Sequence, residues 1–313
     1  MQNCVLVTGA AGFIGSHLCK QLLNSYYSVV AVDNFSTGSR ANVPAGAEVV
    51  ELDLTQPNFT QHLPDYHYRA ICHLAGQSSG EKSFENPVYD FDANARSTLL
   101  LSEWAIAQSI PTFLYASSMG VYGRVAHYPV SEETAPAPIS YYGNSKLSAE
   151  RILAIANQRG LRTVSFRMFN VYGPGQNLAN LKQGMVSIYL AYLLKKEPLL
   201  VKGSLERVRD FVYIDDVIRA WQIALEQPVS GIFNLGSGQA VSVRTLIDAL
   251  LHACGLASDY PICEAAGTPG DQGAIAANIT AIQRTLGWQP QVSLEDGLAK
   301  MYAWAQAGIG TTP

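Results

Sequence analysis

The sequence has few of the features that mark secreted, membrane-bound or nucleic-acid-binding proteins. No run of about 18 apolar residues occurs, so no membrane-spanning helix is expected. The first residues lack the basic start of a secretory signal, which predicts a cytoplasmic protein. The formal net charge is only −4 with no block of like charge, so no electrostatic surface for nucleic acids or membranes is expected.

Cysteine and charged residues are also scarce. The five cysteines are scattered and odd in number, and their spacing fits neither a disulfide framework nor a metal site. Buried free thiols in a reducing compartment are therefore expected. Charged residues make up 15% of the chain and hydrophobic residues 48%, which is typical of a compact protein and argues against disorder. At 313 residues the chain is long enough for two lobes.

Short apolar runs alternate with helical patterns through the first half of the chain. Strands without polar alternation, separated by helices, indicate a parallel sheet covered on both faces. We therefore predict an α/β fold with a doubly wound parallel sheet of the Rossmann type. The predicted strands are Val5–Val7, Val29–Val32, Val49–Leu52, Ala70–Leu74, Thr112–Ala116 and Thr163–Phe166.

The pattern changes after Phe169, where Asn170–Gly175 is rich in turn residues. Residues 1–170 are predicted to form the Rossmann domain. Residues 171–313 are predicted to form mainly a smaller C-terminal α/β lobe that binds substrate, with residues 206–235 partly returning to the first domain.

A glycine-rich turn joins the first predicted strand to the helix that follows. Gly9 allows a tight turn, Gly12 lets the backbone approach a pyrophosphate, and Gly15 lets the helix pack close to the sheet. The free N–H groups at the start of that helix would bind the phosphates. Because a strand and a helix flank the turn as required, the motif predicts a dinucleotide-binding site.

A carboxylate at the end of the second strand indicates which dinucleotide binds. Asp33, followed by Asn34, lies about 20 residues after the glycines, where it can accept hydrogen bonds from both ribose hydroxyls and repel a 2′-phosphate. This predicts NAD rather than NADP, although Arg40 follows a few residues later. Asp53-Leu54 follows the third strand, where an adenine would lie, and a helix cap is the alternative for Asp53.

A tyrosine and a lysine, Tyr142 and Lys146, stand four residues apart on a predicted helix and share one face. A nearby ammonium lowers the pKa of a tyrosine from about 10, so such a phenol can exchange a proton with a substrate hydroxyl. Ser118 ends the fifth strand, at the edge where ligands bind in such sheets, and can hydrogen-bond the same substrate oxygen. These three residues are the candidate catalytic group.

These motifs resemble those of the extended short-chain dehydrogenases/reductases, specifically the sugar-nucleotide epimerases. The resemblance covers nearly the whole chain. It implies that carbon 4 of a nucleotide-linked sugar is oxidised by NAD, that the 4-keto sugar turns over, and that hydride returns to its other face. Further motifs that carry the resemblance are His73–Gly76, Ala116–Gly123, Arg167–Asn170, Arg209–Val217, Asn234–Gly238 and Pro269–Asp271.

The resemblance implies roles for the candidate catalytic group. Tyr142 would be the acid/base, Lys146 would tune it and hold the nicotinamide ribose, and Ser118 would bind the reacting hydroxyl. No metal is expected. The cofactor site is expected to comprise Gly9, Ala11, Gly12, Phe13, Ile14, Asp33, Asn34, Asp53, Leu54, Leu74, Ala75, Gly76, Asn94, Tyr142 and Lys146.

The resemblance also implies a substrate site and an assembly. Asn170 and Arg209 would hold the substrate's diphosphate, and Asp271 would bond the nucleotide ribose. The expected substrate is a UDP-linked sugar of the glucose/galactose, N-acetylglucosamine or glucuronate type, and the expected assembly is a homodimer. The substrate site is expected to comprise Ser78, Ser79, Ser118, Tyr142, Asn170, Arg209 and Asp271.

Residues beside Ser118 distinguish reactions within the family. Dehydratases carry an Asp-Glu pair there to expel water and decarboxylases a nearby Glu, whereas this chain has Met119-Gly120. A 4-epimerase, which is an isomerase, is therefore favoured. A nucleotide-sugar reductase or dehydratase stays an alternative. A non-catalytic nucleotide-sensing scaffold is a remote one, because the candidate catalytic group is present.

Several positions depart from the family pattern at the expected substrate site. Thr268 takes the place of an arginine that contacts a phosphate in UDP-hexose epimerases, and Arg207 and Arg244 are candidate replacements. The segment Gln77–Ser83 is unusual and is expected near the sugar. Ile275 is smaller than the tyrosine of strict glucose/galactose enzymes, which predicts tolerance of an N-acetyl or otherwise bulkier sugar.

Overall fold

The computed structural model describes residues 3–309, so residues 1–2 and 310–313 of the two predicted domains lie outside it. Seven parallel strands form the main sheet in the order β11-β6-β5-β4-β1-β2-β3. The predicted doubly wound parallel sheet is confirmed, and β11 is a strand that the apolar runs did not reveal. The strands are β1 Cys4–Thr8, β2 Ser28–Asp33, β3 Glu48–Glu51, β4 Tyr68–His73, β5 Thr112–Ser118, β6 Arg162–Met168 and β11 Gly231–Leu235.

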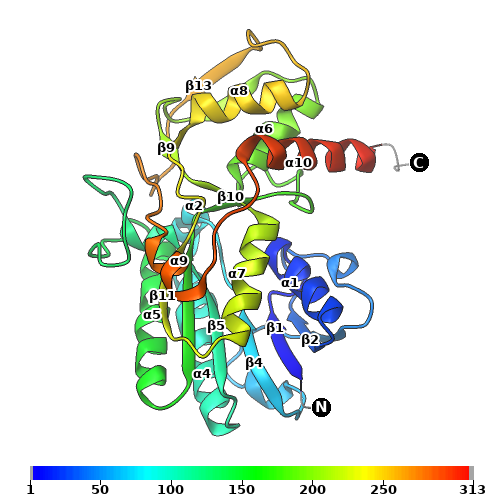
Figure 1. Ribbon diagram of the computed structural model, residues 1–313, viewed down its shortest axis with the longest axis vertical. Coiled ribbons are helices and arrows are strands. Elements are labelled where there is room, and N and C mark those ends of the chain that lie inside the picture. The colour runs from blue at the N-terminus through cyan, green and yellow to red at the C-terminus, as the bar shows by residue number, and fades with distance from the viewer. Residues whose placement is uncertain (1–2, 310–313) are drawn as a thin grey trace.

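Helices cover both faces of this sheet (Figure 1). Alternate residues of β1 explain why: Val5 and Val7 pack in a core with α1 (Phe13–Asn24) and α7 (Ile214–Glu226), whereas Leu6 packs in another core with α4 (Ser97–Ala107) and α5 (Tyr141–Gln158). Successive side chains of a strand point to opposite faces, so an apolar strand needs cover on both sides. The short α2 (Gly80–Glu85), α3 (Pro87–Phe91) and a π-helical turn (Asp92–Arg96) lead into α4.

A smaller group of elements lies beyond the carboxyl ends of the strands, at the top of Figure 1. It contains α6 (Met185–Leu194), α8 (Val243–Ala253) and α10 (Leu294–Ile309). The strand β8 (Leu199–Lys202) pairs there with β13 (Ile262–Ala265). Residues after 170 also return to the main sheet through α7, β11 and α9 (Thr280–Leu286). The domain boundaries themselves stay a prediction.

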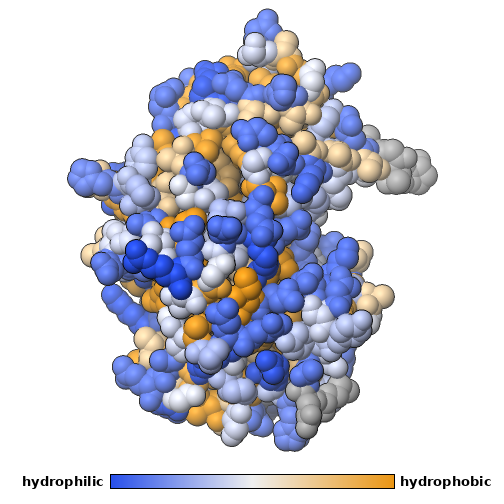
Figure 2. Space-filling view, viewed as in Figure 1, coloured by the Kyte–Doolittle hydropathy of each residue, from blue (hydrophilic) through white to orange (hydrophobic). Residues whose placement is uncertain are grey.

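Two small strand pairs connect the two groups of elements. The strand β7 (Asn170–Tyr172) pairs in parallel with β10 (Phe211–Tyr213), and β9 (Val208–Arg209) pairs antiparallel with β12 (Val241–Ser242). They carry Asn170 and Arg209, two predicted substrate residues, to the carboxyl edge of the sheet. On the face shown in Figure 2, hydrophobic residues are interspersed with hydrophilic ones over both groups.

The first helix approaches the sheet as closely as the glycine turn allows. A Cβ atom on Gly15 would lie 2.1 Å from the carbonyl oxygen of Gly9, so only glycine fits there. Gly9 itself has a φ of +68°, a conformation that favours glycine. These two residues therefore fix the start of α1 against the end of β1.

A buried carboxylate fixes α5 to two strands. Glu150 on α5 accepts hydrogen bonds from Ser117 Oγ on β5 at 2.5 Å and from Arg167 on β6 at 2.7 Å. The Arg167 and Glu150 side chains are only 4% and 2% exposed. Because three elements meet at this carboxylate, the middle of α5 is held against the end of β5.

No described helix is long and apolar enough to cross a membrane. All five cysteines are free, and Cys4, Cys19 and Cys72 are buried as expected. The expected burial is wrong for Cys254, which is half-buried, and for Cys263, which is exposed.

Glu150→Ala is expected to lower the free energy of unfolding by about 3–5 kcal/mol, because Arg167 would be left buried without its partner. The control is Glu103→Ala, which removes an exposed partner of Arg159 and should cost less than about 1 kcal/mol. Urea denaturation of both variants measures the difference. Equal losses would contradict this view of the buried pair.

Candidate active site

Two adjoining cavities open along the carboxyl ends of the strands. The first, the cofactor cavity, is lined by the glycine turn, the end of β2 and residues of α5. The second, the substrate cavity, is lined by the end of β5, the start of β7 and the loop that contains Asp271. Tyr142 lines both cavities. The catalytic, cofactor and substrate residues predicted from the sequence thus converge on one edge of the sheet.

The carboxylate of Asp33 is held at the rim of the cofactor cavity. Its Oδ2 accepts a hydrogen bond from the backbone N–H of Ala11 at 2.9 Å, and its Oδ1 accepts one from Phe35 at 2.8 Å. Each carboxylate oxygen can accept a further bond, so the group can still bind two ribose hydroxyls. Arg40, the residue that complicated the choice between NAD and NADP, pairs with Glu51 at 2.7 Å.

The start of α1 fits a pyrophosphate. Among the described residues no side chain caps this helix, and its first turn has no acidic residue, so its first N–H groups face the cofactor cavity without a competing acceptor. The positive end of the helix dipole adds to their attraction for an anion. The start of α1 suits the pyrophosphate of a dinucleotide, and Asp33 suits its ribose hydroxyls.

Thirteen of the fifteen predicted cofactor residues line the cofactor cavity; Ala11 and Asn94 are buried next to it. Asp53 lines it and also accepts from Thr55 N–H at 2.9 Å within a turn. The next described helical element starts at Phe59, so the helix-cap alternative for Asp53 is wrong. Further lining residues carry no motif and were missed, among them Ser36, Thr37, Thr55, Gln176, Asn177, Asn180, Gln183 and Ser187.

The structure brings the candidate catalytic group together. Lys146 Nζ donates a hydrogen bond to the carbonyl oxygen of Ala116 at 2.9 Å and lies 5.9 Å from the centre of the Tyr142 ring. Ser118 Oγ accepts from the N–H of Gly120 at 3.0 Å. A Cβ atom on Gly120 would lie 3.3 Å from Ser118 Oγ and 3.4 Å from the Tyr142 ring, so this glycine lets the serine and the tyrosine approach each other.

Burial shifts the pKa values of both reactive groups. Burial raises the pKa of Tyr142 to about 12, and a hydrogen bond with Ser118 offsets only part of this. Burial also lowers the pKa of Lys146 to about 8, against the opposing charges of Asp90 and Glu150. The lowered tyrosine pKa predicted from the sequence is therefore wrong for the protein alone, because burial of the phenol raises this pKa.

A buried polar network supports Lys146 from α3 and the π-helical turn. Asp90 accepts hydrogen bonds from Ser145 Oγ at 2.6 Å and from Gln77 Nε2 at 2.7 Å. Asn94 donates to Ser145 at 3.1 Å, while its Oδ1 has no partner within residues 3–309. No motif in the sequence pointed to Asp90, and a single aspartate is more often exposed than buried.

All seven predicted substrate residues line the substrate cavity. Within the unusual segment Gln77–Ser83, Ser79 caps α2 by accepting from Lys82 N–H. Part of that segment, residues 78–81, forms a wall of the cavity. Ile275, expected to limit sugar size, is instead fully buried and packs with Val121 and Phe169. Ile275 is not part of the described lining of the substrate cavity, so it does not support the predicted tolerance of bulky sugars.

The model of the NAD-dependent epimerase/dehydratase family matches residues 5–236. This chain belongs to that family. It is 34% identical over 304 residues to UDP-glucose 4-epimerase of Mycolicibacterium smegmatis, covering 94% of this chain and 96% of the relative.

Solved epimerase structures share the whole fold. The UDP-glucose 4-epimerase of Thermotoga maritima, solved with UDP-glucose, has a TM-score of 0.92 and 33% identity, covering 98% of this chain and 99% of that one. The UDP-glucuronic acid 4-epimerase of Bacillus cereus, solved with UDP-glucuronic acid and NAD, has a TM-score of 0.88 and 30% identity, covering 97% and 99%. The cofactor of this family member is therefore NAD.

Lys146→Met is expected to raise the free energy of unfolding of the NAD-free protein by about 2–3 kcal/mol at pH 7, because an ammonium is no longer buried. Between pH 8 and 10.5 the folded protein loses this proton before the unfolded chain does. The wild type therefore gains stability as pH rises through this range, and the difference between the two proteins shrinks.

Urea denaturation of the wild type and Lys146→Met at about pH 7 and about pH 10 measures this difference. A difference of the same size at both values would mean that the ammonium is not destabilised by burial.

Proposed function

We propose that this protein is an NAD-dependent UDP-sugar 4-epimerase, an isomerase that inverts carbon 4 of the sugar. The observation that carries the proposal is the position of Tyr142 in the wall shared by the two cavities. Lys146 stands beside it in the cofactor cavity, and Ser118 stands beside it in the substrate cavity. A proton on the Tyr142 hydroxyl can thus be exchanged with a sugar while the sugar's carbon faces the cofactor.

The residues of the chain move the proton. Bound NAD would supply the means to accept and return a hydride, and the positive charge of its oxidised form would favour the tyrosine phenolate. Ser118 holds the hydroxyl at carbon 4, and Tyr142 Oη takes its proton. The same oxygen returns the proton when the 4-keto sugar is reduced on its other face. Lys146 supplies an ammonium that stabilises the phenolate and binds the nicotinamide ribose.

The charges of the substrate cavity favour epimerisation over loss of water. Elimination needs an acid that protonates the leaving hydroxyl. Within the described lining of this cavity the carboxylates are Glu81 and Asp271, and both pair with basic side chains. Ser118 is followed by Met119 and Gly120, neither of which can donate a proton from its side chain. This arrangement supports a reaction in which the oxygen at carbon 4 is retained.

The relatives suggest which UDP-sugars to test. The T. maritima enzyme was solved with UDP-glucose and the B. cereus enzyme with UDP-glucuronic acid. We propose a substrate of the UDP-glucose/galactose, UDP-N-acetylglucosamine or UDP-glucuronate type. A reductase would use the same three catalytic residues, and net consumption of NADH would identify it.

The proposal includes a homodimer. Two hydrophobic residues, Leu99 on α4 and Ile155 on α5, are exposed in the single chain. Pairing of the α4–α5 faces of two chains would remove them from water, which is favourable. The cytoplasmic location expected from the sequence belongs to the same proposal.

Tyr142→Phe removes only the phenolic oxygen, so turnover is expected to fall at least about 100-fold while NAD still binds. NMR of the products formed from UDP-glucose, UDP-N-acetylglucosamine and UDP-glucuronate measures turnover and identifies the sugar. The matched control is Tyr141→Phe, since Tyr141 is the exposed neighbouring tyrosine and should be dispensable. Near-normal activity of Tyr142→Phe would refute its proposed role.

A further inference from the structure

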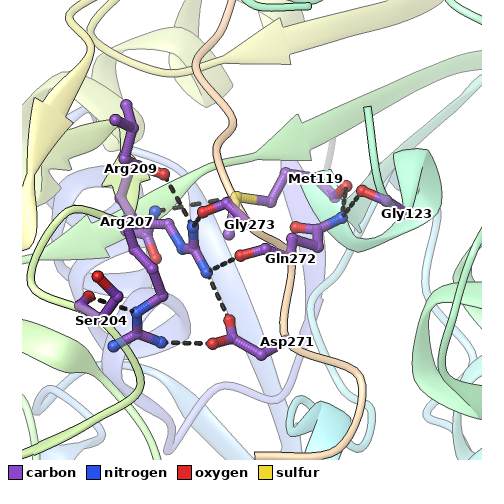
Figure 3. A network of polar contacts seen from close by, with 10 residues as sticks. Met119, Gly123, Ser204, Arg207, Arg209, Asp271, Gln272 and Gly273 are labelled. Carbon is purple, nitrogen blue, oxygen red and sulfur yellow. Dashed lines mark hydrogen bonds and ion pairs between the residues drawn. The ribbon is translucent and has the colours of Figure 1, made fainter. Parts of the chain in front are cut away.

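Two guanidinium groups share one carboxylate in the wall of the substrate cavity (Figure 3). Arg207 Nη1 lies 2.5 Å from Asp271 Oδ2, and Arg209 Nη2 lies 2.5 Å from Asp271 Oδ1. The arginine side chains are only 12% and 4% exposed. The two arginines therefore converge on Asp271 from neighbouring positions around β9.

The charges of this cluster do not balance. Within residues 3–309 no second carboxylate pairs with Arg207 or Arg209, so one positive charge is left over in a mostly buried place. An unpaired charge away from water is costly unless a ligand compensates it. The cluster therefore suits an anion, and a pair of guanidinium forks suits the several oxygens of a diphosphate.

Backbone carbonyls hold the two arginines in place. Arg209 Nη1 donates to the carbonyl oxygens of Val208 and Gly273 at 2.8 Å each, and Arg207 Nε donates to that of Ser204 at 3.1 Å. Gln272 connects this loop to the turn after β5 by donating to the carbonyl oxygens of Met119 at 3.2 Å and Gly123 at 2.8 Å (Figure 3). The site is thus shaped before an anion arrives, which lowers the entropic cost of binding.

The structure distinguishes the two candidate replacements for the arginine that Thr268 displaces. Thr268 lines the substrate cavity with Arg207 and Arg209. Arg244, in contrast, is an exposed residue of α8 and does not belong to the described lining of this cavity. Of the two, only Arg207 belongs to the described lining of the substrate cavity.

We infer that Arg207 supplies the second guanidinium for the substrate's diphosphate and, with Arg209, forms a two-arginine clamp oriented by Asp271. This assignment rests on the proposed function, because that function names a UDP-linked substrate. Arg207 would thereby determine affinity for the nucleotide diphosphate, while proton transfer stays with Tyr142, Lys146 and Ser118.

Calorimetric titration with UDP and with uridine tests this assignment. Arg207→Gln is expected to weaken UDP binding by about 10- to 100-fold, since it removes charge-assisted hydrogen bonds to phosphate. Uridine has no phosphate, so its affinity should stay near that of the wild type. NAD affinity should also be unchanged, which verifies folding. Arg244→Gln is the matched control and should bind UDP as the wild type does.

A double variant separates direct contact from an effect on Asp271. Arg207→Gln with Thr268→Arg places a guanidinium back on the cavity wall and should recover most of the lost UDP affinity. Failure to recover it would overturn the direct contact, as would an Arg207→Gln variant that binds UDP normally. Either result leaves the proposed function intact. If the wild type bound NAD but neither UDP nor any UDP-sugar, both the assignment of Arg207 and the proposed function would be overturned.

Discussion

The buried carboxylate of Glu150 holds together the elements that carry the reacting groups. It joins α5 to Ser117 on β5 and to Arg167 on β6. The strand β5 ends in Ser118, and the first turns of α5 carry Tyr142 and Lys146. A rigid connection between this helix and this strand is thus what keeps the serine, the tyrosine and the lysine at one place. Such positioning is a large part of what an enzyme contributes to a reaction between bound groups.

The same burial that positions these groups also sets their charges. In the protein alone, loss of water favours the neutral form of Tyr142 and of Lys146. The site therefore holds a protonated phenol until a cation arrives in the cofactor cavity. On the other side of Tyr142, the arginine pair at Asp271 carries surplus positive charge that suits a diphosphate. The substrate cavity thus carries a surplus charge that its proposed ligand would neutralise.

Local signals in the sequence predicted the parts of the site that local structure determines. The glycine turn, Asp33 at the end of β2 and the four-residue spacing of Tyr142 and Lys146 all depend on neighbours along the chain. The rest depends on distant contacts: β11 pairs with β6, which lies far earlier in the chain, and Arg207 reaches Asp271 across 64 residues. The pKa of Tyr142 was mispredicted for a related reason, because spacing reveals a neighbouring charge but not the loss of water.

The central claim is that hydrogen leaves carbon 4 of the sugar and returns to the same carbon within one site. Incubation of the enzyme with a UDP-sugar that carries deuterium at carbon 4, followed by NMR of the epimer, tests it most directly. The account predicts that the product keeps its deuterium at carbon 4 and that no NADH accumulates. Loss of deuterium to water, or its appearance at another carbon, would contradict it.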